Sequence, residues 1–178
     1  MTALERSALT IELPVKLRLA TANDLPKLEW YGQFAHFRNL FRRTFREQQQ
    51  GHRLMLIADC NDFPIGQVFV QLNGGESRIG VPQKRAYLYS LRVMEMFRGK
   101  GVGTWLMREA EAMVASAGYQ WLTIAAAKDN PAARRLYERM GFRVFSEDSG
   151  DWSYLDHRGI VQYVHEPCWV LEKRLQLR

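Results

Sequence analysis

Short runs of β-branched, aromatic and alternating apolar residues predict a series of strands. One of them, residues 15–20, alternates apolar and polar positions with a period of two, as expected for a strand with one buried face. A turn sequence at 61–64 separates two further apolar runs, which predicts an antiparallel hairpin. The expected strands cover residues 15–20, 53–60, 65–72, 85–93, 121–127, 142–147 and 168–175.

Other segments place apolar residues at helical spacing and carry helix-start or helix-stop residues. Thr21, Asn23 and Asp24 are candidate caps for a helix that begins near Asp24. A second predicted helix covers residues 38–50, is rich in arginine, and stops at Gly51. Two more predicted helices begin near Val102 and Pro131.

Composition favours one domain over several. The chain has 178 residues, of which 47% are hydrophobic, and it contains no repeat or Pro/Gly/Ser-rich linker. We expect one domain over residues 15–178, with residues 1–14 as a loose arm.

No stretch approaches the roughly 20 apolar residues of a membrane span, and the start lacks a signal-peptide pattern, so we expect a cytoplasmic protein without a membrane partner. Cys60 and Cys168 stand far apart without neighbouring ligands, so the sequence predicts neither a disulfide framework nor a metal site.

A glycine-rich turn is the strongest local sign of ligand binding. Gly99, Gly101 and Gly103 occupy every second position around the start of the helix expected near Val102. Free backbone N–H groups and the helix dipole attract anions there, and Arg98 and Lys100 add positive charge. The turn therefore predicts a phosphate site. A Walker loop needs Ser or Thr after its Gly-Lys pair, and a dinucleotide fingerprint needs Gly-x-Gly-x-x-Gly after an early strand, so neither pattern fits.

Two motifs resemble the GNAT superfamily of acyl-CoA-dependent N-acyltransferases. The run Arg98-x-x-Gly101-x-Gly103, between "LRV" and a helix, is similar to that family's pyrophosphate motif. The segment "DNPAARRLYERMGF" at 129–142 resembles its second cofactor motif, with Asn130 as the helix cap. The likeness extends over about residues 15–175. It implies an α+β fold: a mixed, mostly antiparallel sheet with helices on both faces, whose strands at 85–93 and 121–127 run parallel and splay around the cofactor.

The same resemblance implies acetyl-CoA as the cosubstrate, without a metal. The cofactor arm would add like a strand to free backbone groups near Val93, and Arg134 or Arg135 would reach a phosphate. The residues that the family pattern assigns to the cofactor are Leu91, Val93, Arg98, Gly99, Lys100, Gly101, Val102, Gly103, Thr104, Asn130, Ala133, Arg134 and Tyr137.

Transfer of an acetyl group to a primary amine sets three catalytic tasks. By resemblance, the backbone N–H of Val93 stabilises the oxyanion and Tyr137 donates a proton to the leaving thiolate. The base that accepts the amine proton is open, because the strand at 85–93 carries no acid. Glu95, in the following turn, is a weak candidate, and Tyr89 or Ser90 would hold a water instead. Glu29, His36 and His165 are further alternatives, and each also has an ordinary structural explanation.

The acceptor side is predicted less sharply. Aromatic residues crowd the segment 29–41, as core or as a wall of the acceptor site. Acidic residues cluster at 146–159, before the closing strand, either as a solvated loop or as an attraction for cationic amines; they are Glu147, Asp148, Asp151 and Asp156. The acceptor is a small-molecule amine or a peptide or protein amine. A homodimer through an exposed closing strand at 168–175 is a further expectation.

Two other functions compete with the transferase. A non-catalytic acyl-CoA sensor or scaffold would also keep the cofactor motifs and would need no base. The net charge of +6 and the arginine-rich helix suggest nucleic acid binding, but no recognised reading motif accompanies them.

Overall fold

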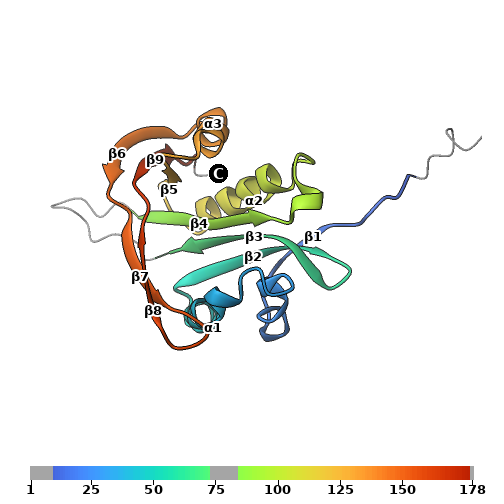
Figure 1. The fold of residues 1–178 in the computed structure, drawn as a ribbon. Helices are drawn as coiled ribbons and strands as arrows, with labels where there is room; N and C mark the ends of the chain where they lie inside the picture. The colour runs from blue at the N-terminus through green and yellow to red at the C-terminus, as the bar shows by residue number, and fades with distance from the viewer. Residues whose placement is uncertain (1–9, 73–83, 177–178) are drawn as a thin grey trace, which may run out of the picture.

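A seven-stranded sheet forms the centre of the molecule (Figure 1). The computed structural model describes residues 10–72 and 84–176, so that residues 1–9 of the expected arm lie outside them. In sheet order the strands are β1 (Lys16–Leu19), β2 (Arg53–Cys60), β3 (Phe63–Gln71), β4 (Arg85–Val93), β5 (Trp121–Ala127), β9 (Cys168–Arg174) and β6 (Arg143–Asp148). Every neighbouring pair is antiparallel except β4 and β5, which run parallel. The expected mixed, mostly antiparallel sheet is confirmed.

Three α-helices cover the two faces of this sheet. The helix α1 (Arg38–Gln49) packs on one face, where a core cluster contains Phe41 and Phe69. The helices α2 (Val102–Ser116) and α3 (Pro131–Arg139) contribute to a larger cluster on the other face. The predicted helix starts near residues 38, 102 and 131 are therefore confirmed, and the sheet separates two cores.

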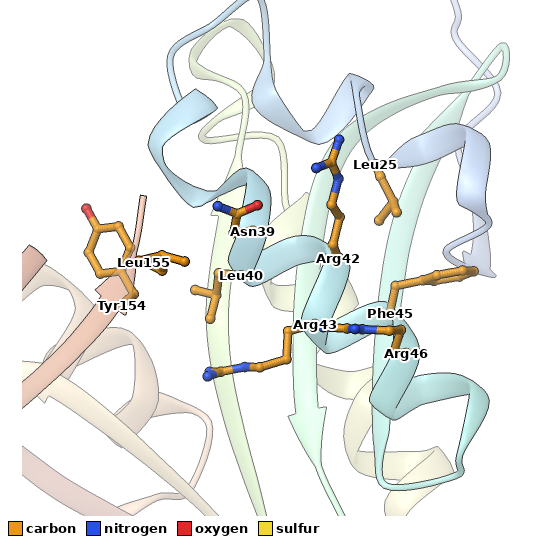
Figure 2. A pocket seen from close by; sticks show the side chains of 9 residues that line it. All are labelled: Leu25, Asn39, Leu40, Arg42, Arg43, Phe45, Arg46, Tyr154 and Leu155. Atoms are coloured by element: carbon orange, nitrogen blue, oxygen red, sulfur yellow. The ribbon is translucent and has the colours of Figure 1, made fainter. Parts of the chain in front are cut away.

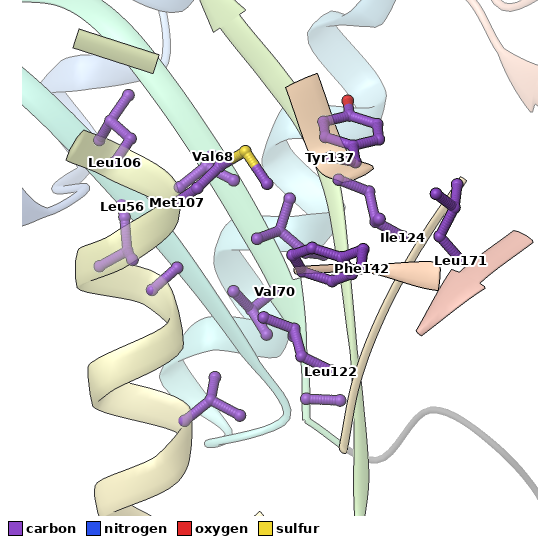
Figure 3. Packing of buried hydrophobic residues seen from close by; sticks show 14 of the residues in the cluster. Leu56, Val68, Val70, Leu106, Met107, Leu122, Ile124, Tyr137, Phe142 and Leu171 are labelled. Carbon is purple, nitrogen blue, oxygen red and sulfur yellow. The ribbon is translucent and has the colours of Figure 1, made fainter. Parts of the chain in front are cut away.

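The larger core depends on the spacing of apolar residues along α2. Leu106, Met107, Ala110 and Val114 repeat at three- or four-residue intervals and are fully buried against the sheet. Figure 3 shows Leu106 and Met107 on the side of the cluster where α2 lies, with Tyr137 and Leu171 toward the opposite side and Phe142 between them. This packing holds the N-terminus of α2 beside the end of β4.

The helix expected near Asp24 is not present. The chain forms short 3₁₀ turns instead, at Ala22–Asp24, Lys27–Glu29 and Ala35–Phe37. Trp30, Tyr31 and Gly32 have successive positive φ values of 42°, 58° and 94°, and a right-handed helix cannot pass through such residues. Capping residues alone do not make a helix where the chain must turn back.

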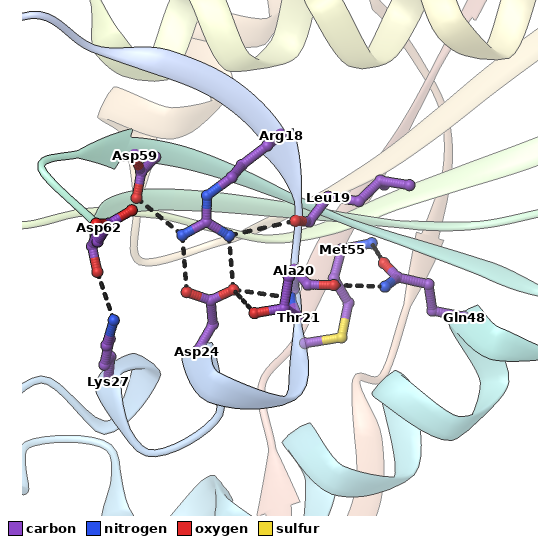
Figure 4. A network of polar contacts seen from close by, with 10 residues as sticks. All are labelled: Arg18, Leu19, Ala20, Thr21, Asp24, Lys27, Gln48, Met55, Asp59 and Asp62. Carbon is purple, nitrogen blue, oxygen red and sulfur yellow. Dashed lines mark hydrogen bonds and ion pairs between the residues drawn. The ribbon is translucent and has the colours of Figure 1, made fainter.

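A buried ion-pair network fixes this N-terminal segment to the sheet (Figure 4). Arg18 donates to both carboxylate oxygens of Asp24 at 2.6 and 2.8 Å and to Asp59 at 2.8 Å. Burial opposes ionisation of Asp24, but hydrogen bonds from Arg18 and Thr21 outweigh it and hold the pKa of this carboxyl below its ordinary value. The network ties the turn after β1 to β2.

The acidic segment at 146–159 is mostly strand, which the sequence did not predict. Here β7 (Asp151–Leu155) pairs with β8 (Val161–His165) in a separate two-stranded sheet. Asp156 is buried in the connecting turn, where the N–H of Ile160 and other donors lower its pKa to about 2. Its backbone carbonyl also accepts a hydrogen bond from Asn39 at 2.6 Å, which joins this hairpin to α1. Asp156 therefore holds a turn and is not a free charge at an entrance.

The closing strand is also placed differently from expectation. β9 lies between β5 and β6, and it pairs with both along its length. Its backbone is used inside the sheet, so a homodimer cannot add to it, and the expectation of an exposed closing strand is wrong. Among the described strands, β1 and β6 form the edges of the sheet.

Candidate active site

The central feature of the site is a gap between the two parallel strands. β4 and β5 pair from Arg85 with Trp121 to Leu88 with Ile124, and no partners follow, although β4 continues to Val93 and β5 to Ala127. The strands therefore separate at their carboxyl ends, as the sequence comparison implied. Backbone groups of β4 beyond Leu88 face this gap.

A β-bulge in β4 changes which side chains enter the gap. Gln67 of β3 pairs with Arg92, but Phe69 pairs with Tyr89, so β4 carries one extra residue between these points. Ser90 lies in this stretch with a φ of 55°, a left-handed conformation that is uncommon for serine. Strict alternation would place Tyr89 and Arg92 on opposite faces of the sheet. The bulge puts both on the α1 face.

The same bulge directs the end of β4 toward the cofactor motif. Leu91 packs into the core under α2, and Val93 lies beside Gly103 in the first turn of that helix. The N–H of Met94 donates to Ile65 of β3 at 2.9 Å, and successive backbone groups of a strand point in opposite directions. The N–H of Val93 is therefore directed away from β3, toward the gap. Its carbonyl accepts a hydrogen bond from Arg98 at 3.0 Å.

The glycine turn stands next to this backbone. Gly99 and Gly101 have φ values of 72° and 85°, and Gly101 is the residue that caps α2. In the part of the chain that the structure describes, no backbone hydrogen bond is donated by Gly99, Lys100 or Gly101. The first N–H groups of α2, from Val102 on, lack helical partners as at any helix start. This set of donors and the exposed Lys100 suit a phosphate group.

The second motif begins and ends α3 as expected. The Asn130 side chain accepts the N–H of Ala133 at 3.1 Å, Pro131 occupies the first turn, and Gly141 follows the helix with a φ of 91°. Tyr137 points from α3 into the large core, 7% exposed, and burial raises the pKa of its hydroxyl (Figure 3). Arg134 is held by Glu138 at 2.9 Å and lies over the ring of Trp169.

A cavity of about 760 Å³ passes through the gap. Tyr137 and Ile124 line it from the side of α3, and Tyr89, Phe37 and Trp152 line it from the side of α1. Both faces of the sheet thus open into one space. The predicted residues Tyr137, Leu91, Tyr89 and Ser90 meet here.

The other predicted bases lie elsewhere. Glu95 is exposed in the 3₁₀ turn Glu95–Phe97, and Glu29 is bound to Arg38 at 2.6 Å. His165 pairs with Asp151, and the ring of His36 lies tilted against Phe37, where burial lowers its pKa.

Several cavity residues were missed in the sequence. They are Tyr87, Arg92, Glu166 and Cys168. Tyr87 stacks on Tyr89 at 5.8 Å, and burial raises its pKa to about 12; the period-two spacing of these tyrosines is a signal that could have found it. No sequence pattern indicates that Arg92 lines the cavity, because the bulge in β4 determines on which face of the sheet its side chain lies.

A second depression lies over the outer side of α1. Figure 2 shows Arg42, Arg43 and Arg46 around it, with Tyr154 and Leu155 of the β7–β8 hairpin across from Leu40. The basic residues of α1 thus project to the outside of this helix, apart from the glycine turn. Arg43 lines both this depression and the larger cavity.

Comparison with known proteins places these features in one family. The family model described as "Acetyltransferase (GNAT) family" matches residues 19–142, well over half of the chain. The chain belongs to the GNAT acetyltransferase family. The matched range contains the glycine turn, the gap and α3, whereas β9 and the β7–β8 hairpin follow it.

Individual relatives agree with the family. The chain is 32% identical over 62 residues to the uncharacterized N-acetyltransferase YycN of Bacillus subtilis, a match that covers 35% of this chain and 40% of that protein. The chain thus spans about two fifths of the length of the curated relatives it matches.

Two solved structures share the fold over nearly the whole chain. A GNAT-family protein of Desulfovibrio desulfuricans aligns with a TM-score of 0.69 at 15% identity, over 92% of this chain and 100% of that one. The structure of Arabidopsis thaliana NAA60 in complex with acetyl-CoA aligns with a TM-score of 0.67 at 20% identity, over 90% and 98%.

The described residues contain neither a membrane-spanning helix nor a cluster of metal ligands. None of their helices is long and apolar enough to cross a membrane. Within 10–72 and 84–176, no group of three or more His, Cys, Asp or Glu side chains is placed to hold a metal ion.

Proposed function

We propose that this chain transfers an acetyl group from acetyl-CoA to a primary amine. The observation that carries the proposal is the gap between β4 and β5, into which the N–H of Val93 is directed and which Tyr137 lines. Family membership and the likeness to a fold that holds acetyl-CoA in NAA60 support it.

The cofactor would enter along the unpaired edge of β4. Backbone groups of Leu91 and Val93 would pair with the amides of its pantetheine arm, as an added strand does. The turn at 98–104 would hold the pyrophosphate through backbone N–H groups. Asn130 and Ala133 would contribute by starting α3 correctly, and Arg134, already paired with Glu138, would have to change partner to reach a phosphate.

The reaction needs a neutral amine and a good leaving group. The amine nitrogen attacks the thioester carbonyl carbon, and the N–H of Val93 stabilises the oxygen that becomes negative. The carbon–sulfur bond then breaks, and Tyr137 donates its hydroxyl proton to the departing thiolate. Because burial raises the pKa of Tyr137, its hydroxyl is protonated at neutral pH and ready to donate.

In this proposal a bound water accepts the amine proton and passes it along hydrogen-bonded waters to the solvent. Tyr89 lines the cavity and would hold this water through its hydroxyl, which accepts a hydrogen bond from Arg53 at 2.7 Å and also interacts with Thr44. Glu95 lies outside the cavity, so it would need a longer water path.

Cofactor binding is tested by a matched pair of variants at one glycine. Asn and Asp both tolerate the left-handed conformation of Gly101, and they differ in one negative charge. At about 100 times the dissociation constant, acetyl-CoA should add roughly 2.7 kcal/mol to the stability of the wild type. We expect Gly101→Asn to keep most of this shift and Gly101→Asp to lose it, with ATP and NAD giving none.

Turnover is then measured as thiol release from acetyl-CoA with a panel of primary amines. Amine-dependent release supports the transferase. Binding of acetyl-CoA without release for any amine, including peptide N-termini, would instead make the chain an acyl-CoA sensor. Absence of acetyl-CoA binding would overturn both functions.

A further inference from the structure

Arg92 occupies an unusual position for a charged side chain. It follows the bulge in β4 and lines the cavity on the α1 face. Its guanidinium lies over the rings of Phe34 and Phe37, 4.6 and 4.9 Å from their centroids. One of its nitrogens donates to the Ser90 hydroxyl at 2.9 Å. Two aromatic rings and one hydroxyl thus surround a half-buried cation.

No carboxylate of the described residues forms an ion pair with Arg92 within 4.0 Å. Other arginines of the same region differ. Arg18 binds Asp24, Arg38 binds Glu29, and both pairings raise the pKa of the arginine. Burial instead lowers the pKa of Arg92 to about 10, and the charge of Glu166, beyond ion-pair distance, only partly offsets it. Arg92 stays charged at neutral pH, with most of its donors uncommitted.

The position of Arg92 relates this charge to the reaction. The N–H of its neighbour Val93 is directed into the gap between the strands. The side chain of Arg92 points to the α1 face of the sheet, among Phe37 and Tyr89. A group bound by Arg92 would therefore lie on the acceptor side, next to the reacting atoms. The glycine turn, at the start of α2, belongs to the other face of the sheet.

The other residues that line this half of the cavity are of two kinds, aromatic and acidic. Phe37, Phe69 and Trp152 supply aromatic surface. Asp148 at the end of β6, and Asp151 and Glu166 at the open end of the β7–β8 hairpin, supply carboxylates, of which Asp151 is paired with His165. A guanidinium and carboxylates that line the same cavity match a molecule that carries both signs. A planar carboxylate fits the fork of arginine donors especially well.

We propose that the acceptor is a primary amine that also carries a carboxylate, as an amino acid with an aromatic or large apolar side chain does. Its carboxylate binds Arg92, its side chain lies on the aromatic wall, and its amine faces the gap beside Val93. The carboxylates that line the cavity attract the amine before it loses its proton. This inference rests on the proposed transferase activity and names its substrate class.

The test compares acceptors that differ only in the carboxylate. Acetylation rates are measured for L-phenylalanine, its amide and phenethylamine with the wild type, Arg92→Gln and Arg42→Gln. We expect the wild type to favour phenylalanine, and Arg92→Gln to lower its kcat/KM about 100-fold, mainly through KM, while the rate with phenethylamine changes little. Arg42→Gln removes an exposed charge outside the cavity, so it should keep the preference.

Stability separates this function from a structural role. An unpaired, partly buried charge costs free energy, so Arg92→Gln should melt at or above the temperature of the wild type. Equal loss of rate for all three amines, or a lower melting temperature with an unchanged preference, would overturn the role of Arg92. A wild type that acetylates phenethylamine as well as phenylalanine would overturn the acceptor class while leaving the transferase intact. Failure with every amine would overturn the transferase itself.

Discussion

The two faces of the central sheet are built in different ways. On the face of α2 and α3, the ligand-binding features come from consecutive residues, such as the turn at 98–104 and the cap at Asn130. On the face of α1, the cavity wall combines β4, α1 and the β7–β8 hairpin, which are far apart in the chain. Local chemistry can be recognised in a sequence, whereas a wall assembled from distant segments depends on the fold. The reaction would take place where these two kinds of structure meet.

The largest loss of activity should come from a change on the face of α2 and α3, whose motifs can be recognised in the sequence. Tyr137→Phe removes one hydroxyl without changing the packing of the ring, so turnover should fall about 10²- to 10⁴-fold while the Kd for acetyl-CoA stays unchanged. Steady-state kinetics and calorimetric titration measure the two quantities. Tyr119→Phe, at a tyrosine outside the cavity, is the control and should keep full turnover. Full activity in Tyr137→Phe would remove the catalytic role that the motif suggests.

On the other face, the largest effect should come from a glycine that no motif marks. Gly150 has a φ of 66°, and a Cβ there would overlap the backbone carbonyl of Glu166. Gly150→Ala should lower the free energy of unfolding by roughly 2–4 kcal/mol, because the start of β7 must move away from the end of β8. The matched control is Gly159→Ala in the same hairpin, where φ is 81° but no atom lies within 4 Å. It should cost about 1 kcal/mol.

Urea unfolding of both variants measures this difference. Thermal shifts with acetyl-CoA should remain, since the hairpin is not part of the glycine turn. Equal costs for the two alanines would show that the close approach of Gly150 to Glu166 does not matter for stability.

A third, smaller effect concerns pH and the network of Arg18. The pKa of Asp24 is depressed in the folded chain, so its contribution is fully present above the ordinary value of about 4 and is lost as pH falls through the folded pKa. Asp24→Asn should therefore cost about 2 kcal/mol at pH 7 and progressively less at acidic pH. Chemical denaturation between pH 7 and 3 tests this. A constant difference across that range would contradict the ionic character of the network.

The smallest effect returns to the cofactor side. Asn130→Ala removes the side-chain acceptor for the N–H of Ala133 and should lower stability by about 1 kcal/mol. Asp129→Ala, at the exposed neighbouring position, should change stability by less than about 0.5 kcal/mol. Thermal denaturation compares the two. A larger loss of stability in Asp129→Ala than in Asn130→Ala would show that Asn130 is not the helix cap.

The sequence predicted most strands, the helices α1, α2 and α3, and the cofactor motifs. The predictions were wrong or missing where the structure depends on contacts between segments that are distant in the chain. Thr21, Asn23 and Asp24 suggested the start of a helix, but three residues with positive φ turn the chain back soon after them. The strand β7 lies in the segment 146–159, whose acidic residues suggested a solvated loop, and no strand was predicted at β8. The face of Arg92 depends on one extra residue in β4, which simple alternation cannot indicate.

The position of β9 has a consequence for the order in which the fold forms. β1, β2, β3 and β4 are neighbours in the sheet in the order of the chain, and each pair is antiparallel. Although a long connection precedes β2, these strands can pair as they leave the ribosome. β6 is made well before β9, yet β9 is the only strand of the seven-stranded sheet with which it pairs in the described structure. Until residues 168–174 have been synthesised, β5 has one free edge and β6 has no place in the sheet. The wall of the cavity that contains Cys168 and Val170 is therefore completed last, after both cofactor motifs have been made.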